Sequence, residues 1–364
     1  MNWLYDHLRS IPRHVPLVLS DRLVNRREFP LLEARSRDPD RLTRRVWHRL
    51  MGERIYPIEA MWLRRRRPEI LHSHFGYVAM GDFALRAFLD VPWIVGFYGA
   101  DVYELGRSEA WRERYARLFA QLDLVLALGP YMAVHLQLLG CPKDKIAVHP
   151  LGIDVDALPS RQRVLQPGTP LQVLFAGTFR EKKGVEYVIR GVANARARGV
   201  RLHLTLVGDA AGKAGDQETK EAIFREINRL ELNDVVTHRP FVPFDELIQI
   251  ALAAHVFVAP SVTSADGDAE GTPFVLQQMM ATGMPVIATT HSDIPYILGG
   301  EQHRLVPERD AEAIATRLQE YVEEPERLGR DGMALRERMR AAFDVRACGA
   351  QLSDIYDAVR AHRR

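Results

Sequence analysis

Short apolar runs alternate with amphipathic stretches along this sequence, and this alternation constrains the fold more than any other feature. The apolar runs have the length of buried strands, and the stretches between them repeat apolar residues at the spacing of a helix. Strands that alternate with helices form parallel sheets with right-handed crossovers. The predicted strands are His14–Ser20, Glu69–His74, Trp93–Tyr98, Leu124–Leu128, Ile146–Pro150, Leu171–Ala176, Arg201–Val207, Val235–His238, Val256–Pro260, Pro285–Thr289 and Arg304–Val306. The clearest predicted helices are Ala110–Gln121, Val185–Arg198, Glu218–Leu230 and Phe244–Ala253.

These strands are too many for one doubly wound sheet of the usual size, so we predict two domains. The length of 364 residues also corresponds to about two domains. We predict an α/β fold of two Rossmann-like, doubly wound parallel-sheet domains that face a cleft, with ligands beyond the carboxyl ends of the strands. The first domain covers residues 1–160, and the second covers 161–340 after the polar linker Ser160–Pro170. The helical end, 341–364, packs either on the second domain or back on the first.

The composition excludes several classes of protein. With 47% hydrophobic and 26% charged residues, the chain is not disordered, collagenous or disulfide-stapled. No apolar run approaches the ~18–20 residues that span a bilayer, and no secretory signal is visible. The two cysteines, Cys141 and Cys348, lie far apart, which favours a cytoplasmic location. Residues 1–70 hold 16 Arg and no Lys against nine acidic residues, so we expect an anionic membrane surface there rather than nucleic acid.

A strand, a polar loop and a helix follow one another between residues 256 and 290. The strand ends at Pro260, and an acidic loop leads to a helix that begins near Thr272 and Pro273. Thr272 can cap this helix, Pro273 suits its first position, and Gly283 suits the position after its end. The pattern therefore predicts a helix N-terminus at the carboxyl edge of the sheet.

This helix N-terminus is a candidate anion site. Backbone N–H groups in Gly271–Phe274 and the helix dipole favour a phosphate there. Glu270 precedes them and can accept hydrogen bonds from sugar hydroxyls, while Gln278 lies on the same helix face as Phe274. A capped helix with a solvent-facing Glu270 explains the pattern equally well on physical grounds alone.

A basic loop opens the second domain. The loop Gly177–Gly184 follows the first strand of that domain and carries Arg180, Lys182 and Lys183. Cations between glycines at this position suit a phosphate. At least one of the three is expected to be a solvated charge.

The residues Glu270–Thr289, with the loop before them, resemble the motif of glycosyltransferase family 4, and the run Ser261–Pro273 most resembles members that build bacterial exopolysaccharides of the colanic-acid type. The family consists of retaining enzymes with the GT-B fold that use nucleotide sugars. The resemblance implies that Glu270 holds hydroxyls of the donor sugar, that the backbone of Gly271–Phe274 meets the diphosphate, and that Lys183 neutralises it. The family pattern has a second Glu that grips the ribose, and here Gln278 stands at that position, without charge.

The basic loop departs from the family pattern at one position. The family Arg directly follows the strand-end glycine, here Gly177, but this chain has Thr178 there and its nearest Arg is Arg180. We therefore expect Glu270, Lys183 and Arg180 to be catalytic, and Gly177 and Thr178 to line the donor site. The resemblance implies no cofactor and no metal, and the acidic pair at 266 and 268 is not taken as a metal site.

The first domain carries the expected acceptor side. Two predicted strands end at His74 and Tyr98, and Gly76, Gly99 and Asp101 follow them. The family commonly has His-Gly-x-Asp at the second place, so here Tyr98 occupies the His position. The resemblance implies a glycan or lipid-linked acceptor near these residues.

Two features of the first 70 residues lead to further expectations. The chain begins at what resembles the helix and second strand of the family's first domain, so we expect this domain to lack its opening strand. Arg64–Arg67 follow Trp62 and Leu63, and apolar residues precede them, which favours either a helix that binds an anionic membrane from the cytoplasmic side or an ordinary helix with a solvated basic end. The upstream apolar residues are Trp47, Met51, Ile55, Tyr56, Ile58 and Met61.

Three functions fit these residues. The first is a retaining glycosyltransferase that moves a sugar from a nucleoside diphosphate sugar to a glycan or lipid-linked acceptor in exopolysaccharide or cell-surface polysaccharide synthesis. The second is a phosphorylase or hydrolase of the same fold, which would use phosphate or water. The third is a non-catalytic protein that binds a sugar nucleotide. Turnover of the donor with and without acceptor separates them.

Overall fold

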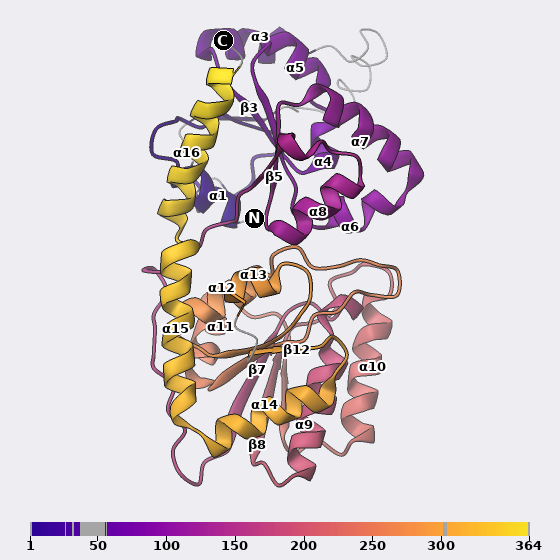
Figure 1. Ribbon diagram of the computed structural model, residues 1–364, viewed down its shortest axis with the longest axis vertical. Helices are drawn as coiled ribbons and strands as arrows, with labels where there is room; N and C mark the ends of the chain where they lie inside the picture. Colours follow the sequence, from indigo (N-terminus) through magenta and orange to yellow (C-terminus); the bar gives the residue numbers. More distant parts are fainter. Residues whose placement is uncertain are drawn as a thin grey trace. The chain divides into compact units, whose positions relative to one another are not determined.

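The computed structural model describes residues 2–25, 27–30, 33–36, 55, 57–300 and 304–362. They form two compact α/β units (Figure 1). The first unit consists of Met1–Leu128, Ala133–Gly152 and Val345–Arg364. The second unit consists of Gly129–Met132 and Ile153–Asp344.

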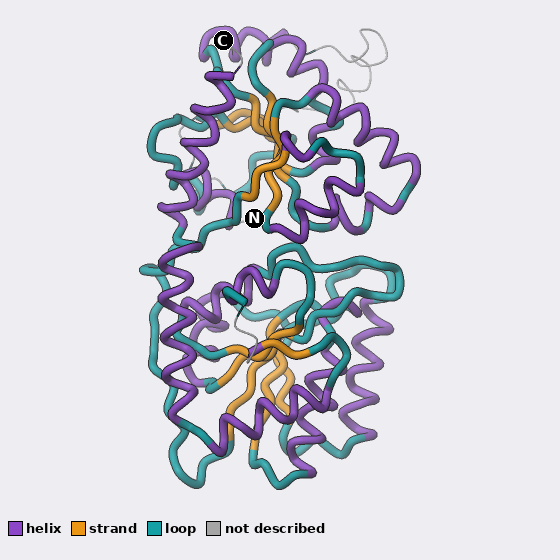
Figure 2. The backbone as a smooth tube through the Cα atoms, in the orientation of Figure 1, coloured by secondary structure: helices purple, strands orange, loops and turns teal. Residues whose placement is uncertain are grey.

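Strands and helices alternate in both units (Figure 2). The strands are β1 (Val18–Ser20), β2 (Ala34–Ser36), β3 (Leu71–His74), β4 (Trp93–Gly96), β5 (Leu124–Ala127), β6 (Ile146–Val148), β7 (Leu171–Ala176), β8 (Leu202–Val207), β9 (Val236–Arg239), β10 (Val256–Ala259), β11 (Val286–Thr289) and β12 (Leu305–Val306). The helices of the first unit are α1 (Asn2–Arg9), α3 (Pro57–Arg66), α4 (Gly76–Ala79), α5 (Phe83–Leu89), α6 (Ala100–Tyr103), α7 (Glu109–Gln121), α16 (Val345–His362) and α8 (Pro130–Leu138), whose residues up to Met132 are grouped with the second unit. The helices of the second unit are α9 (Val185–Ala197), α10 (Asp216–Arg229), α11 (Phe244–Ala253), α12 (Phe274–Ala281), α13 (Ile294–Leu298), α14 (Ala311–Glu323) and α15 (Glu326–Ala342).

The second unit is a parallel sheet with helices on both faces. Its strand order is β12-β11-β10-β7-β8-β9, and every pair is parallel. Side chains alternate across the sheet, so Val173 and Phe175 pack with α9, α10 and α14, whereas Leu174 and Ala176 pack with α11, α12, α13 and α15. Because both faces are covered, β10 and β11 are buried along their whole length, and all their residues except Thr289 at the end of β11 are apolar.

The first unit has a parallel sheet of order β3-β4-β5-β6, and β1 pairs with β2 in a separate parallel sheet. One face of the larger sheet packs against α1 and α16. There, Leu352 and Tyr356 of α16 bury against Ile94 and Leu126 of the sheet and against Ile11. The last helix of the chain therefore belongs to the first unit.

The predicted fold class, α/β with two Rossmann-like parallel-sheet units, is confirmed. Each of the eleven predicted strands has an observed counterpart, and β2, with only three residues, was not predicted. The chain leaves the first unit at Gly152, before the predicted boundary at 160, because Val155 and Leu158 are already part of the core of the second unit. A break at Phe343 and Asp344 separates α15 from α16.

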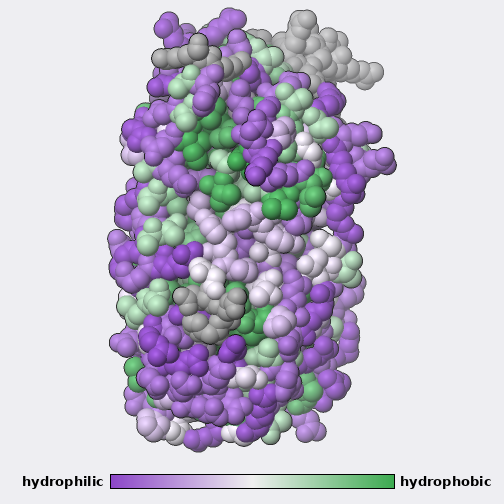
Figure 3. Space-filling model, viewed as in Figure 1, coloured by the Kyte–Doolittle hydropathy of each residue, from purple (hydrophilic) through white to green (hydrophobic). Residues whose placement is uncertain are grey.

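The surface of the second unit is mostly hydrophilic over α9 and α14 on the side drawn in Figure 3. This is the pattern of helices that bury one face against a sheet and expose the other. Within the described residues, no helix combines the length and the apolar character needed to cross a membrane.

Candidate functional site

The loops that follow β7 and β10 meet backbone to backbone in the second unit. Gly184 ends the basic loop with a φ of +63°, and a side chain there would collide with the carbonyl oxygen of Pro260. Val262 donates its N–H to the carbonyl oxygen of Lys182 at 2.9 Å. Glycine at 184 is thus required both by its conformation and by the close approach of the two loops.

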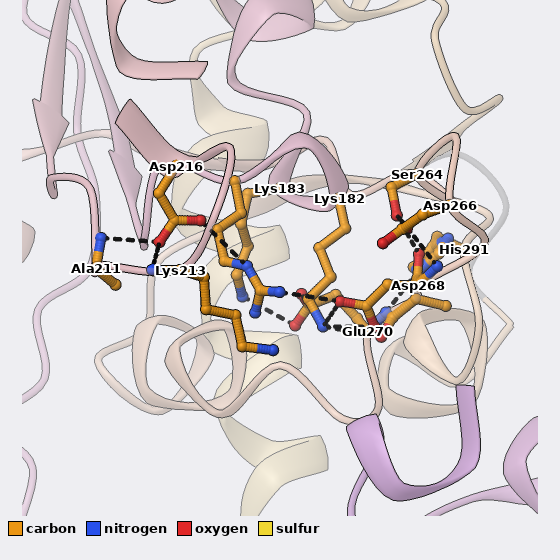
Figure 4. Close-up of polar contacts among 12 residues, drawn as sticks. Lys182, Lys183, Ala211, Lys213, Asp216, Ser264, Asp266, Asp268, Glu270 and His291 are labelled. Carbon is orange, nitrogen blue, oxygen red and sulfur yellow. Dashed lines mark hydrogen bonds and ion pairs between the residues drawn. The ribbon is translucent and has the colours of Figure 1, made fainter. Parts of the chain in front are cut away.

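All three cations of the basic loop have acidic partners (Figure 4). Lys183 donates from Nζ to Oε2 of Glu270 at 2.9 Å. Lys182 donates to Asp268 and to the carbonyl oxygen of Ala269, both at 3.1 Å. Arg180 lies 3.2 Å from the same Asp268, and Asp216 lies 3.6 Å from its Nε atom. The expected solvated cation is therefore not found in this loop.

Glu270 is a buried carboxylate with one oxygen still available. It is 7% exposed, and burial by itself would raise its pKa, but Lys183 and Lys182 outweigh burial and lower the pKa to about 2. Its Oε1 atom accepts no hydrogen bond from the described residues and lies 3.7 Å from Nζ of Lys182. The solvent-facing Glu270 considered above is wrong, and the side chain is ionised and ready to accept hydrogen bonds.

The start of α12 offers donors for an anion. The backbone N–H groups of Gly271, Thr272, Phe274 and Val275 have no hydrogen-bond partner among the described residues. The predicted cap at Thr272 is wrong, because Pro273 occupies the N-cap position and no side chain caps the helix. The Thr272 hydroxyl is instead buried without a partner. Unsatisfied donors at a helix N-terminus favour an anion.

A pocket of about 390 Å³ joins these features within the second unit. Predicted site residues share its lining: Gly177, Thr178, Lys183, Glu270, Thr272, Pro273, Phe274 and Gln278. Phe241, Val242 and Leu247 add an apolar part to the wall. Arg180 is not among the lining residues, since its guanidinium is directed to Asp268 and Asp216.

The five residues predicted for the acceptor side lie together in the first unit. His74 and Tyr98 share a hydrogen bond of 2.5 Å between Nδ1 and the phenol oxygen. Asp101 is fully buried and accepts N–H groups from Gly76 at 3.1 Å and from Tyr98 and Gly99 at 2.9 Å. Burial raises the pKa of Asp101, and these N–H groups oppose that effect. Asp101 therefore joins the loops after β3 and β4, and its role toward an acceptor stays a prediction.

Sequence reasoning missed residues that support the pocket. Phe241 is not among them: it is 55% exposed and belongs to the stretch His238–Leu247, which in sequence already resembles the strand and turn that line the family's base pocket. His291 and Glu308 were not noted, and both follow strands of this sheet, β11 and β12. Their positions after neighbouring parallel strands are the signal that could have found them.

The predicted basic helix is only partly covered by the structure. Trp47, Met51 and Tyr56 lie outside the described residues. The described part is α3, where Ile58 and Met61 are about half exposed.

Two family models together match nearly the whole chain. The model "Glycosyl transferases group 1" matches residues 158–342, and the model "Glycosyltransferase Family 4" matches residues 21–157. The first match contains the whole pocket described above.

Individual proteins resemble the chain as well. The putative colanic acid biosynthesis glycosyltransferase WcaL of Salmonella typhimurium is 32% identical over 72% of this chain and 63% of its own length, which is just under two thirds of that relative. The amylovoran biosynthesis glycosyltransferase AmsK of Erwinia amylovora is 31% identical over 79% of this chain and 70% of its own length. The crystal structure of Anabaena Alr3699/HepE in complex with UDP has the same fold, with a TM-score of 0.78, 16% identity and coverage of 98% of this chain and 95% of that one.

Proposed function

The chain belongs to the group 1 glycosyltransferases, a class of enzymes, and we propose that it transfers a sugar from a nucleoside diphosphate sugar to a glycan or lipid-linked acceptor in exopolysaccharide synthesis. The names of the relatives support the exopolysaccharide context. A UDP-sugar is the first donor to test, because UDP is the ligand of the structural neighbour HepE.

One observation carries the proposal. A buried, ionised Glu270 with a free Oε1 atom lies in the same pocket as Lys183 and the unsatisfied N–H groups at the start of α12. A carboxylate binds sugar hydroxyls strongly, and a cation with backbone donors binds a diphosphate. The pocket thus offers separate partners for the two ends of a sugar diphosphate.

These groups also suit the transfer step. Lys183 and the N–H groups of α12 can stabilise the negative charge that develops on the leaving diphosphate, which is the usual main electrostatic contribution to rate. Glu270 orients the sugar through its free oxygen. The Glu270 carboxylate is already paired with Lys183 at 2.9 Å, so we assign it an orienting role. We propose that the acceptor enters on the same face of the sugar from which the diphosphate leaves, with retention at the anomeric carbon. We assign no step to a metal, since Asp268 is engaged by Lys182 and Arg180.

We propose that the acceptor binds to the first unit near His74 and Tyr98, which share a hydrogen bond. We propose that α3 brings this unit to the inner face of an anionic membrane, where a lipid-linked acceptor would be found. Ile58 and Met61 expose apolar surface on α3, and basic residues occupy its last turn. Cys141 and Cys348 are buried thiols that form no disulfide within the described residues, which fits the reducing conditions of the cytoplasm.

The experiment that tests the donor pocket is titration calorimetry with UDP on the full chain and on Lys183→Ala. We expect the variant to bind UDP about 10–100-fold more weakly, because one charge-assisted contact to phosphate is lost. Lys143→Ala, an exposed lysine of the first unit, is the matched control and should leave the affinity unchanged. Equal UDP affinity in Lys183→Ala and the control would remove Lys183 from the diphosphate site.

Turnover then separates the three functions named by the sequence. UDP release from UDP-sugars that depends on an added glycan acceptor supports a transferase, and the anomeric signal of the product reports retention. Acceptor-independent release stimulated by phosphate or water supports the phosphorylase or hydrolase. Binding without turnover across a panel of UDP-, GDP- and dTDP-sugars would overturn the enzymatic proposal.

A further inference from the structure

Two consecutive residues after β11 hold the backbone of Glu270. Its N–H donates to Nε2 of His291 at 3.0 Å, and its carbonyl oxygen accepts from the Ser292 hydroxyl at 2.7 Å. His291 is 1% exposed and lies beside Glu270 in Figure 4. Both polar backbone groups of the residue that carries the pocket carboxylate are thus fixed by one loop.

The hydrogen bonds determine the tautomer of His291. A backbone N–H can only donate, so Nε2 carries a lone pair and no proton. Nδ1 lies 2.6 Å from Oε1 of Glu308. Burial would raise the pKa of Glu308, but the N–H of Thr263 and the contact with His291 outweigh it and lower the pKa, so this carboxylate is ionised and accepts. His291 is therefore neutral, with its proton on Nδ1.

Glu308 lies after β12, so its contact with His291 adds a third loop to those after β10 and β11. Its Oε2 accepts the N–H of Thr263 at 2.9 Å, in the loop that runs from β10 to Glu270. The residues after β10, β11 and β12 are thus joined through one imidazole. Such a connection restrains the position of Glu270 more than its own contact with Lys183 can, since a lysine side chain is long and flexible.

We propose that His291, oriented by Glu308, is a positioning residue that holds Glu270 where its free oxygen can meet the donor sugar. This inference rests on the proposed function. Neither residue lines the pocket, so they act through Glu270. Small displacements of an orienting group reduce rate strongly, and partners that orient a functional side chain are commonly worth 10–100-fold in activity.

A matched pair of substitutions separates positioning of Glu270 from a purely structural role. His291→Gln puts a carbonyl oxygen near the place of Nε2 and retains the acceptor for the Glu270 N–H. His291→Asn puts an amide nitrogen near the place of Nδ1 and retains only the contact with Glu308. Turnover of UDP-glucose should fall 10–100-fold in the Asn variant and less than fivefold in the Gln variant, with UDP affinity within threefold of the unmodified chain in both.

The control is His203→Gln, on β8, where the imidazole contacts Thr237 at the surface and turnover should not change. Equal turnover in His291→Asn and His291→Gln, at any level, would overturn the proposal. A loss of UDP affinity equal to the loss of turnover would overturn it too, because the whole pocket would then have changed. If the unmodified chain does not turn over UDP-glucose, the donor proposal fails for that sugar, and the next measurement decides the inference alone.

Nitrogen-15 NMR of labelled histidine observes the tautomer directly. The signals that disappear in His291→Gln belong to His291, and we expect them to show a protonated Nδ1 and a bare Nε2. Glu308→Gln should shift these signals, since the acceptor at Nδ1 changes. A proton on Nε2 in the unmodified chain would refute the hydrogen bond to Glu270 and with it the proposal.

Discussion

The two units carry different chemistry at the carboxyl ends of their sheets. In the first unit four uncharged histidines lie close to one another, His74 pairs with the Tyr98 phenol, and the carboxyl of Asp101 is held by backbone N–H groups. In the second unit the corresponding edge is ionic, with Lys183 against Glu270 and two further cations against Asp268. Uncharged groups can hydrogen-bond sugar hydroxyls, and cations suit a diphosphate, so this difference is a reason for proposing the acceptor in the first unit and the nucleotide in the second.

The histidines of the first unit are held uncharged by their surroundings. Burial lowers the pKa of His74 to about 4, and burial together with neighbouring histidines lowers that of His7 to about 3. Burial lowers the pKa of His149 to about 4 as well, while a contact with Gln351 opposes this. Burial also lowers the pKa of His72, which stacks on His74 with ring centroids 4.2 Å apart. None of these rings is then charged at neutral pH.

The largest expected effect is selective acid unfolding of the first unit. A histidine whose folded pKa is depressed binds fewer protons folded than unfolded, so its contribution to stability is present above pH 6.5 and is lost as pH falls toward the folded value. For His74 this loss reaches roughly 3 kcal/mol by pH 4, and His7 and His149 add to it. The raised pKa of Asp101 works in the opposite direction.

Tryptophan fluorescence reads this transition in the first unit alone, because the five tryptophans of the chain are at positions 3, 47, 62, 93 and 111. The Glu270 carboxylate titrates at lower pH. Its pKa is lowered from 4.5 to about 2, so its contribution to the stability of the second unit is lost only below pH 4.5. As the pH is lowered to 5, UDP should therefore still bind after the tryptophan fluorescence has changed. His7→Phe should move the fluorescence transition to lower pH, and a transition that stays in place would contradict the role of the histidines.

The second-largest effect concerns the carboxylate of Glu270 in the pocket of the second unit. Glu270→Gln should lower the rate of transfer by about 10²–10³-fold, or ~2.7–4 kcal/mol, if the lost contact resembles one donor of an oxyanion hole. UDP affinity should stay the same or increase, because Lys183 loses its acidic partner. Steady-state turnover and calorimetry on the same samples measure both quantities. Unchanged turnover would reduce Glu270 to a partner of Lys183.

The third effect tests a buried side chain that belongs to neither the ionic nor the neutral group. Gln277 of α12 is fully buried, and its amide nitrogen and oxygen have no partner among the described residues. Gln277→Met keeps the side-chain length and removes both groups, so the second unit should gain ~1–3 kcal/mol of unfolding free energy. Urea denaturation followed by circular dichroism should show the gain, and the tryptophan signal of the first unit should not move. A loss of stability would mean that Gln277 has a bound water or another partner.

The smallest effect adds a charge to the donor pocket. Gln278→Glu should tighten UDP binding by up to about tenfold, because a charge-assisted hydrogen bond is roughly twice as strong as a neutral one. Sugar preference should change little, because Glu270 remains in place. Calorimetry with UDP checks the affinity, and competition between UDP-sugars checks the preference. Weaker binding would place Gln278 near the phosphates rather than near a ribose hydroxyl.

The sequence by itself determined the order of strands and helices, the two-unit α/β fold, and the grouping of Glu270, Lys183 and the start of α12. These follow from local periodicity and from the rule that parallel strands bring their carboxyl ends to one edge of the sheet. The predicted ends of α12 were only partly correct. Gly283 does lie just after the helix with a φ of +73°, but Pro273 rather than Thr272 takes the N-cap position.

Only the tertiary structure decided which charges pair and which residues support them. Arg180 turns to Asp216 and Asp268, although its place in the sequence suggested a phosphate contact. His291 contacts Glu270 from a different loop. Helix α16 follows the second unit in the sequence but belongs to the first unit. Such partners are far apart in the chain, and their choice depends on distances of a few ångströms within a packed interior, which local residue patterns do not encode.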